Sequence, residues 1–565
     1  MKESFRQCMA WLHTWVGLVV GWILFFVFVT GTAGYVDDEI TRWMEPERPL
    51  PMQVLPEQSS QMLDQALTQL QAHAPAESKA WTIILPHQAL NPRATQGLSI
   101  GWEEMPQPGQ RARRGGEELD PVTGQIQPET EPRATAGGTG LYRMHYALHY
   151  IPYPVAIWLV GICTMLMLLA VITGVVTHKK IFTDFFTFRP GKGQRSWLDA
   201  HNIVSVMSLP FFLMITYTGL IFFMSIYMPT GREVMYGATE EGRQAYFQDL
   251  RQQKRDFLPI SAPQASLSEM MHSAEQAWGK NSIASVQITH PADSQAYVEL
   301  RRTGVTGVYW TRAETLRFNA IDGSAMEPEN NSNVTGDTHR VLLALHEGVF
   351  AEWWLRWLYF ICGLAGTAMI GTGLVIWLGK RQLKHSGSGV MPFELRLVEV
   401  LNIASMAGLL IAIAVFFWTN RLLPVEMAGR ADWEVNSFFV VWGMSLLHAM
   451  VRRGRAAWVE QLTLAASLFG AVPLLNALTT PMTGTPTWAR MLCRLCARWS
   501  RSTTMRVGRS LAEGGWCTGS NGEGGRRLIL CAAPRPRPAA PCMPGGPAAA
   551  TVRRARNAGE HRAPA

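Results

Sequence analysis

Two long apolar segments of this chain follow the same pattern. Trp11 to Tyr35 and Leu198 to Ile226 each begin near a histidine, His13 or His201, and each reaches a Thr-Gly pair seventeen residues after that histidine. Both apolar runs exceed the about 20 residues that a helix needs to cross the hydrocarbon of a bilayer. Because seventeen helical residues rise roughly 25 Å, each histidine and its Thr-Gly pair are expected near opposite membrane faces. The chain is therefore predicted to be a polytopic α-helical membrane protein with an internal repeat.

The composition agrees with this prediction and limits the alternatives. Of the 565 residues, 48% are hydrophobic and only 17% are charged, and the apolar residues are gathered into blocks, as in polytopic membrane proteins. A cleaved secretory signal is the alternative for the first segment, but the run exceeds the roughly 7–15 residues of a signal core and its repeat partner lies deep in the chain. The net charge of +8 comes from an arginine-rich tail, so the body of the protein gives no indication of nucleic-acid binding.

Apolar blocks and polar stretches alternate and predict the domains. A duplicated unit of span, α+β module and span is followed by a C-terminal three-span extension. The tail at 484–565 is rich in Arg, Pro, Gly and Ala without apolar periodicity, so we expect it to be disordered or an out-of-frame translation. In chain order the predicted segments are TM1 (1–36), module 1 (37–143), TM2 (144–178), a loop (179–197), TM3 (198–230), module 2 (231–340), TM4 (341–379) and TM5–TM7 (398–480).

Both polar stretches are predicted to fold, with the same order of elements. The first contains a helix-like stretch, two strands and a turn, at Glu57 to Ala74, Ala80 to Leu85, Gly97 to Trp102 and Asp120 to Gly124. The second contains a helix-like stretch and strands in the same order, at Ser266 to Trp278, Ser285 to Thr289 and Ala296 to Leu300. The repeat therefore extends into the polar modules.

Loop charges predict the orientation. Five Lys and Arg residues lie between TM2 and TM3, and three more follow TM4 directly, whereas the long modules have mixed charge. The positive-inside rule places the short basic loops in the cytoplasm and both modules outside. In a bacterium this predicts a multi-pass protein of the inner membrane with its modules in the periplasm.

Histidines at the starts of four spans are the candidate functional residues. His13 and His201 begin spans that leave the cytoplasm, whereas His149 and His346 begin spans that return. An ionisable residue in a span is a functional hypothesis by default, although a neutral ring hydrogen-bonded at the interface would explain any single one. Two facing histidines at one depth supply the two axial nitrogens of a haem iron. We therefore expect two haem irons, one between His13 and His201 and one between His149 and His346.

The second pair contains an ambiguity. His145 precedes His149 by four residues and lies on the same helical face, so either is the ligand and the other a hydrogen-bond or propionate partner. His339, seven residues before His346, raises the same question.

The haems are expected to be b-type, because the chain contains no Cys-x-x-Cys-His for covalent attachment. The glycines in these spans either allow close helix packing, which is the expected use, or make room for a porphyrin face; among them are Gly17, Gly31, Gly174, Gly363 and Gly373.

These motifs, taken in their order, resemble a known family. The duplicated layout, the Leu-His openings, the Thr-Gly span ends and the Asp-Pro-Val-Thr-Gly turn at 120–124 are similar to the PepSY-associated transmembrane proteins, over about residues 5–385. That family, often called iron-regulated membrane proteins, includes bacterial inner-membrane reductases of ferric siderophores with b-type haems. The resemblance implies PepSY-like periplasmic modules and places five histidines at the family's membrane positions, namely His13, His145, His149, His201 and His346. The three-span extension departs from this pattern.

The leading functional hypothesis is therefore an oxidoreductase that carries electrons across the membrane to a ferric siderophore or other iron chelate. The segment Gly191 to Ser196 only partly matches a dinucleotide-binding loop and lacks a strand-to-helix setting. Quinol or a separate reductase is implied as the electron donor. The alternative is a non-redox PepSY protein that binds peptides or peptidases, or that serves as a transporter accessory.

Overall fold

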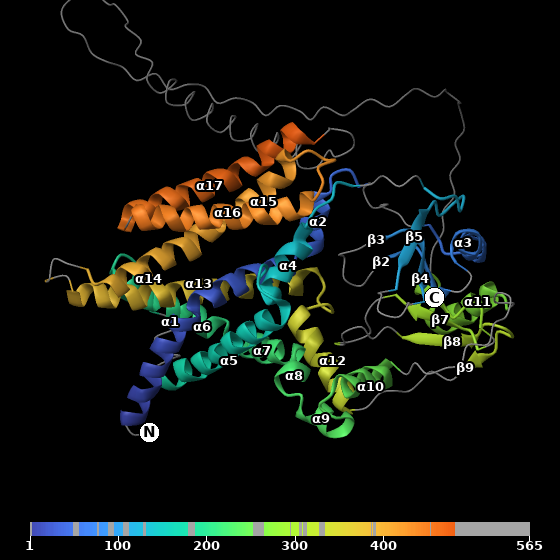
Figure 1. The fold of residues 1–565 in the computed structure, drawn as a ribbon, viewed down its shortest axis with the longest axis horizontal. Coiled ribbons are helices and arrows are strands. Elements are labelled where there is room, and N and C mark those ends of the chain that lie inside the picture. The colour runs from blue at the N-terminus through green and yellow to red at the C-terminus, as the bar shows by residue number, and fades with distance from the viewer. Residues whose placement is uncertain are drawn as a thin grey trace, which may run out of the picture. The chain divides into compact units, whose positions relative to one another are not determined.

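Helices make up most of the described chain, and several of them are long and apolar (Figure 1). The computed structural model describes residues 3–48, 56–75, 78–88, 95–105, 112–127, 132–178, 187–251, 265–293, 295–303, 308, 314–326, 334–385, 387, 391–452 and 454–480. Within these residues, six helices are long and apolar enough to cross a membrane, and one bent helix pair raises the number to as many as seven. The predicted tail at 484–565 lies outside the described residues. The six are α1 (Glu3–Gly34), α5 (Tyr153–Thr177), α13 (Trp353–His385), α14 to α15 (Phe393–Leu422), α16 (Arg430–Val451) and α17 (Gly454–Thr479).

The predicted span TM3 is not one straight helix. It consists of α6 (Gln194–Met207) and α7 (Leu209–Phe222), which meet at Ser208 with a bend of 67°. Pro210, near the start of α7, has no N–H to continue the hydrogen bonding of α6, and its ring crowds the preceding turn. The expectation that His201 and its Thr-Gly pair lie roughly 25 Å apart on one axis is therefore wrong for this segment, although α1 is continuous.

The predicted spans TM2 and TM4 also begin later than expected. In TM2, α4 (Gly137–Ala147) ends before the membrane helix α5, and in TM4, α12 (Val334–Glu347) ends before α13. The first break consists of three residues with left-handed backbone, at φ of 51°, 33° and 39° for Leu148, His149 and Tyr150. The second contains Gly348 at φ 64°. The predicted histidines of these segments thus lie on or just after short helices that precede the spans.

The membrane helices pack as neighbours in a defined order. Helix α1 lies against α5 and α13, α6 lies against α13, and α7 contacts α5 and α12. The predicted extension forms a bundle in which α15 (Leu409–Leu422) contacts both α16 and α17, as Figure 1 also shows. A π-helical turn, Ala404–Gly408, joins α14 (Phe393–Ile403) to α15. The remaining short helices are α2 (Asp37–Met44), α8 (Met224–Tyr227), α9 (Thr230–Tyr236) and α10 (Glu240–Arg251).

The two polar modules share a single antiparallel sheet. Its strand order is β5-β4-β1-β6-β7-β8-β9, and the pairing of β1 with β6 joins the two modules. The strands are β1 (Ser78–Ile84), β4 (Leu98–Glu104), β5 (Arg114–Leu119), β6 (Ile283–Thr289), β7 (Tyr297–Arg302), β8 (Thr315–Asn319) and β9 (Ala325–Met326), with a separate pair β2 (His87–Gln88) and β3 (Thr95–Gln96). The sequence predicted a helix and two strands in each module, β1 and β4 in the first and β6 and β7 in the second, but it did not predict β5 and it treated the modules as separate.

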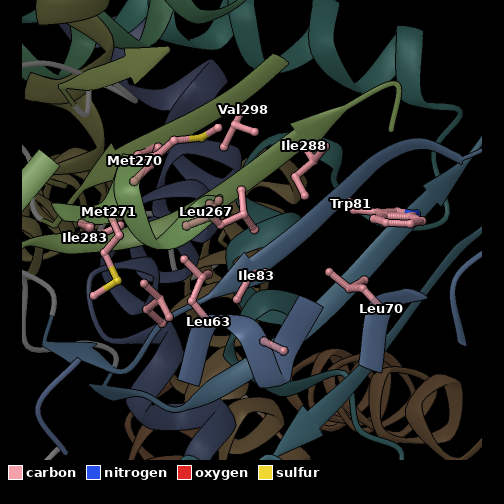
Figure 2. Packing of buried hydrophobic residues seen from close by; sticks show 14 of the residues in the cluster. Leu63, Leu70, Trp81, Ile83, Leu267, Met270, Met271, Ile283, Ile288 and Val298 are labelled. Atoms are coloured by element: carbon pink, nitrogen blue, oxygen red, sulfur yellow. The ribbon is translucent and has the colours of Figure 1, made fainter. Parts of the chain in front are cut away.

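One hydrophobic core underlies this shared sheet (Figure 2). Helices α3 (Ser60–His73) and α11 (Leu267–Trp278) contact each other and both contribute to the core. The β1–β6 register places Trp81 opposite Ile288 and Ile83 opposite Val286, and because side chains alternate along a strand these four share one face. Neither module has a closed core without the other, so the two are expected to fold as one unit.

Candidate cofactor site between the membrane helices

The first histidine pair joins α1 to α6. The ring centres of His13 and His201 are 6.4 Å apart, with an angle of 71° between the ring planes. His13 lies on α1 and His201 on α6, in the two segments whose shared pattern predicted the pair. The structure thus brings these two histidines together from residues almost two hundred positions apart.

The second pair joins α4 to α12. The ring centres of His145 and His346 are 6.2 Å apart, with an angle of 38° between the planes. His149 does not face His346; its ring stacks on Phe439 of α16 at 5.4 Å and 12°. Since α4 ends at Ala147 and His149 has a left-handed backbone, the two histidines do not share one helical face. The predicted pairing of His149 with His346 is corrected to His145 with His346.

Each of the four rings is held through its Nδ1 atom. Three Nδ1 atoms lie within 2.9 Å of a backbone carbonyl oxygen. A carbonyl oxygen can only accept, so in the neutral ring Nδ1 carries the proton and Nε2 is free to bind a metal. The partners are Ala170 O for His13 at 2.8 Å, Val27 O for His145 at 2.7 Å and Met369 O for His201 at 2.9 Å; His346 Nδ1 lies 3.1 Å from Thr218 Oγ1, beside the carbonyl of Ile215.

A glycine lies beneath every one of these rings, and each belongs to a Thr-Gly pair. A Cβ atom built on Gly31 would approach His145 Nδ1 to 2.5 Å, far inside van der Waals contact. The sequence singled out all four Thr-Gly pairs, but it did not predict that a histidine ring would rest on each glycine. The full correspondence is His145 on Gly31, His13 on Gly174, His346 on Gly219 and His201 on Gly373, where the added Cβ would lie 2.5, 3.0, 2.9 and 3.4 Å from the nearest ring atom.

The threonine of each Thr-Gly pair completes the arrangement. The Thr30 hydroxyl donates to two carbonyls of its own helix, including Val27 O, which also accepts from His145. The threonine side chain is thereby turned back along its helix and leaves the glycine surface open to the ring. The other three pairs repeat this bond, from Thr173 to Ala170 O, from Thr218 to Ile215 O and from Thr372 to Met369 O.

The spacing of both pairs fits a shared six-coordinate metal. A metal–imidazole bond is about 2.0–2.1 Å and the ring centre lies roughly 1.1 Å beyond the nitrogen, so two rings on opposite sides of one metal have centres about 6.3 Å apart. The two observed separations, 6.4 and 6.2 Å, fit this value. Among the described residues, no three or more His, Cys, Asp or Glu side chains form a metal-binding group. Two histidines alone suit a metal whose other ligands come from a planar cofactor such as haem.

Three further histidines, like His149, lie outside both pairs. His339 is two turns before His346 on α12, and His178 caps the end of α5. His448 on α16 hydrogen-bonds Glu460 and Gln461 of α17 at 3.1 Å each. A satisfied hydrogen bond is thus the role of His448 in this structure.

The fold and the paired histidines define a class, a polytopic helical membrane protein whose candidate cofactor sites join helices from both halves of the chain. The family model of the PepSY-associated TM region matches residues 10–380, and the chain belongs to that family. No curated protein matches the chain. Helices α14 to α17 lie beyond the matched residues.

Proposed function

We propose that this protein is a bacterial inner-membrane electron-transfer protein that binds two b-type haems and reduces ferric chelates, such as ferric siderophores, in the periplasm. The observation that carries the proposal is the fourfold recurrence of one arrangement, in which a histidine rests on a glycine and donates through Nδ1 to a helix carbonyl or threonine hydroxyl. With Nδ1 engaged, Nε2 is the nitrogen of each ring that would bind a metal. The recurrence also supports a duplicated origin of the two halves.

The two pairs lie far enough apart to connect the two faces of a membrane. His145 rests on Gly31 of α1, whereas His13 is eighteen residues earlier on the same helix, a rise of about 27 Å. The two histidines of each pair would hold the iron of a b-type haem, a ligand set typical of electron-transfer haems. When bound, haem supplies the one-electron redox step, and the chain supplies the ligands and their orientation.

Loop charges support the proposed direction of transfer. Arg189 and Lys192 precede α6, Arg195 lies in its first turn, and Lys380, Arg381 and Lys384 lie in the last turns of α13. The positive-inside rule places these ends in the cytoplasm, near the first pair, and the sheet outside, on the side of the second pair. Quinol or a separate reductase would deliver electrons at the first pair. The iron chelate would accept them on the side of the sheet.

An optical experiment tests the proposal. The dithionite-reduced minus oxidised spectrum of the purified full chain, with pyridine-haemochrome quantification, is expected to give about two b-type haems per chain. His13→Ala and His145→Ala should each remove about one haem. His149→Ala is the matched control, because His149 lies four residues from His145 but faces Phe439, and it should keep both.

The outcomes separate the hypotheses. A colourless protein expressed with haem available would refute the redox proposal and favour a non-redox PepSY protein. Loss of haem in His149→Ala but not in His145→Ala would overturn the assignment of the second pair. If two haems are present, stopped-flow oxidation of the reduced protein by a ferric siderophore tests the acceptor.

A further inference from the structure

The helix that carries His145 is poorly built to stand alone. Three of the first four residues of α4 are glycine, at 137, 138 and 140, and glycine is among the weakest helix formers because it loses the most backbone freedom on ordering. The N-cap residue is Ala136, whose side chain offers no hydrogen-bond acceptor. The first N–H groups of α4 therefore need partners from elsewhere.

Those partners come largely from other elements. The Ala136 N–H donates to Glu434 Oε2 of α16 at 2.9 Å, and the Gly138 N–H donates to Thr41 Oγ1 of α2 at 2.8 Å. Thr135 connects the two sides, since its hydroxyl donates to Glu434 at 2.7 Å and accepts from the Gly137 N–H at 3.1 Å. A carboxylate at a helix N-terminus also interacts favourably with the helix dipole. Glu434 is thus a cap supplied by the extension.

The capping carboxylate is itself held in place. Glu434 and Arg430 form an ion pair at 2.6 Å, and both side chains have 0% exposure. Asn420 at the end of α15 donates to Glu434 at 2.8 Å, and Arg430 donates to the backbone oxygen of Ala134 at 2.8 Å. These contacts fix the carboxylate between α15, α16 and the segment that enters α4.

Apolar contacts continue the same interface along α4. Leu141 and Met144 share a hydrophobic cluster with Phe416 of α15 and Phe438 of α16. Past the end of the helix, His149 stacks on Phe439 and the Tyr150 hydroxyl donates to Asn436. Helix α4 packs against α1 and α2, and the extension adds side-chain contacts at its start, along its length and just beyond its end, whereas α12, which carries His346, packs against α7.

We propose that the C-terminal extension positions the second cofactor site, with Glu434 and Thr135 as the residues that dock α4 so that His145 faces His346. This inference rests on the proposed function for its effect on haem, but the docking itself does not. Glu434 and Thr135 are positioning residues, since their contacts are with the start of α4, eight to ten residues before His145.

Three substitutions in the full chain test the proposal. Glu434→Ala removes the cap, Thr135→Val removes only the hydroxyl, and Thr135→Ser keeps it. Glu460→Ala is the control, because Glu460 lies on α17 and pairs with His448 and Arg452 outside this interface. Haem per chain, the redox titration and hydrogen exchange of a peptide spanning 136–147 are measured for each.

The expected result is specific to one site. Glu434→Ala should lower haem from about two per chain to about one, and it should keep the redox wave of the first pair, which is the wave that His13→Ala removes. Thr135→Val should shift the redox wave of the second pair. Thr135→Ser should return that wave to its wild-type position. Exchange at 136–147 should rise at least about fivefold, the factor that corresponds to a typical helix cap of ~1 kcal/mol. Glu460→Ala should change none of these.

Unchanged exchange in Glu434→Ala, or faster exchange with both redox waves intact, would overturn the positioning role. If the wild-type protein binds no haem, the proposed function fails, and hydrogen exchange alone decides whether α16 docks α4. An equal loss of both haems in Glu434→Ala would point to global misfolding; if Thr135→Val then left both waves unshifted, the positioning role would be overturned.

Discussion

Replacing each of the four glycines beneath the histidines with alanine gives a graded prediction. At Gly31 the new Cβ would lie 2.5 Å from the His145 ring, whereas ordinary van der Waals contact begins at 3.4 Å. The ring would have to retreat by about 0.9 Å, more than the ~0.5 Å that a functional geometry tolerates. At Gly373 the Cβ would lie 3.4 Å from His201, so no retreat is required.

The other two glycines fall between these limits. The added Cβ would lie 3.0 Å from His13 at Gly174 and 2.9 Å from His346 at Gly219. To regain ordinary contact these rings would have to move by roughly 0.4 and 0.5 Å, which is at the limit of the displacement that a functional geometry tolerates. Overpacking of this kind costs about 1–3 kcal/mol, which corresponds to roughly 5- to 150-fold in cofactor affinity. The expected order of haem loss is Gly31, then Gly219 and Gly174, then Gly373.

Haem titration into protein expressed under haem limitation measures this order. Gly17→Ala is the matched control, because Gly17 also lies on α1 but its added Cβ meets nothing within 4 Å. Gly31→Ala should weaken binding at the second pair and leave the first unchanged. Equal effects of Gly31→Ala and Gly373→Ala, or none from Gly31→Ala, would refute the view that the glycine surface sets ring position.

Two further predictions concern stability. Arg430→Met should lower the thermal unfolding midpoint markedly, because removing one partner of a buried ion pair costs about 3–5 kcal/mol, whereas Arg452→Met, in a pair that is largely exposed, should change it little. In the sheet, the Lys79 ammonium and the Arg114 guanidinium hold the pKa of Glu103 below its ordinary value of 4.5. A carboxyl group whose pKa is lowered in the folded state stabilises the fold above pH 4.5, and this stabilisation is lost as the pH falls through the folded-state pKa. Glu103→Gln should therefore raise the hydrogen exchange of β4 and β5 above pH 4.5, and the difference from the wild-type protein should become smaller below pH 4.5. A difference that is independent of pH would contradict this.

The sequence predicted the local elements better than their partners. Alternation of apolar residues predicted β1 and β6, and both strands are present, but the pattern of each strand is satisfied by any antiparallel neighbour. The pairing of Trp81 with Ile288 therefore could not be read from the chain. For the same reason the sequence indicated two modules where the structure has one sheet.

In the candidate site, too, the sequence predicted local features better than the contacts between them. The four spans with histidine and Thr-Gly were visible as a pattern, but which ring rests on which glycine depends on helix packing. The sequence left His145 and His149 as alternatives, because a continuous helix across 145–149 would put both on one face. Non-glycine residues rarely adopt a left-handed backbone, so the residue types of Leu148 to Tyr150 did not predict that the helix ends there.

The two histidine pairs differ in how much the local chain contributes to them. His13 lies within the long helix α1, whose own hydrogen bonds fix its direction. His145 lies on an eleven-residue helix with glycine at three of its first four positions, a length that is marginal for an isolated helix. The second pair therefore depends on tertiary contacts, which come from α1 and α2 and, through the buried carboxylate of Glu434 and the aromatic side chains of α15 and α16, from the extension. A site built this way should be the first to lose its geometry when the extension is perturbed, which is why the two sites are expected to separate in the Glu434 and Thr135 variants and not in the control.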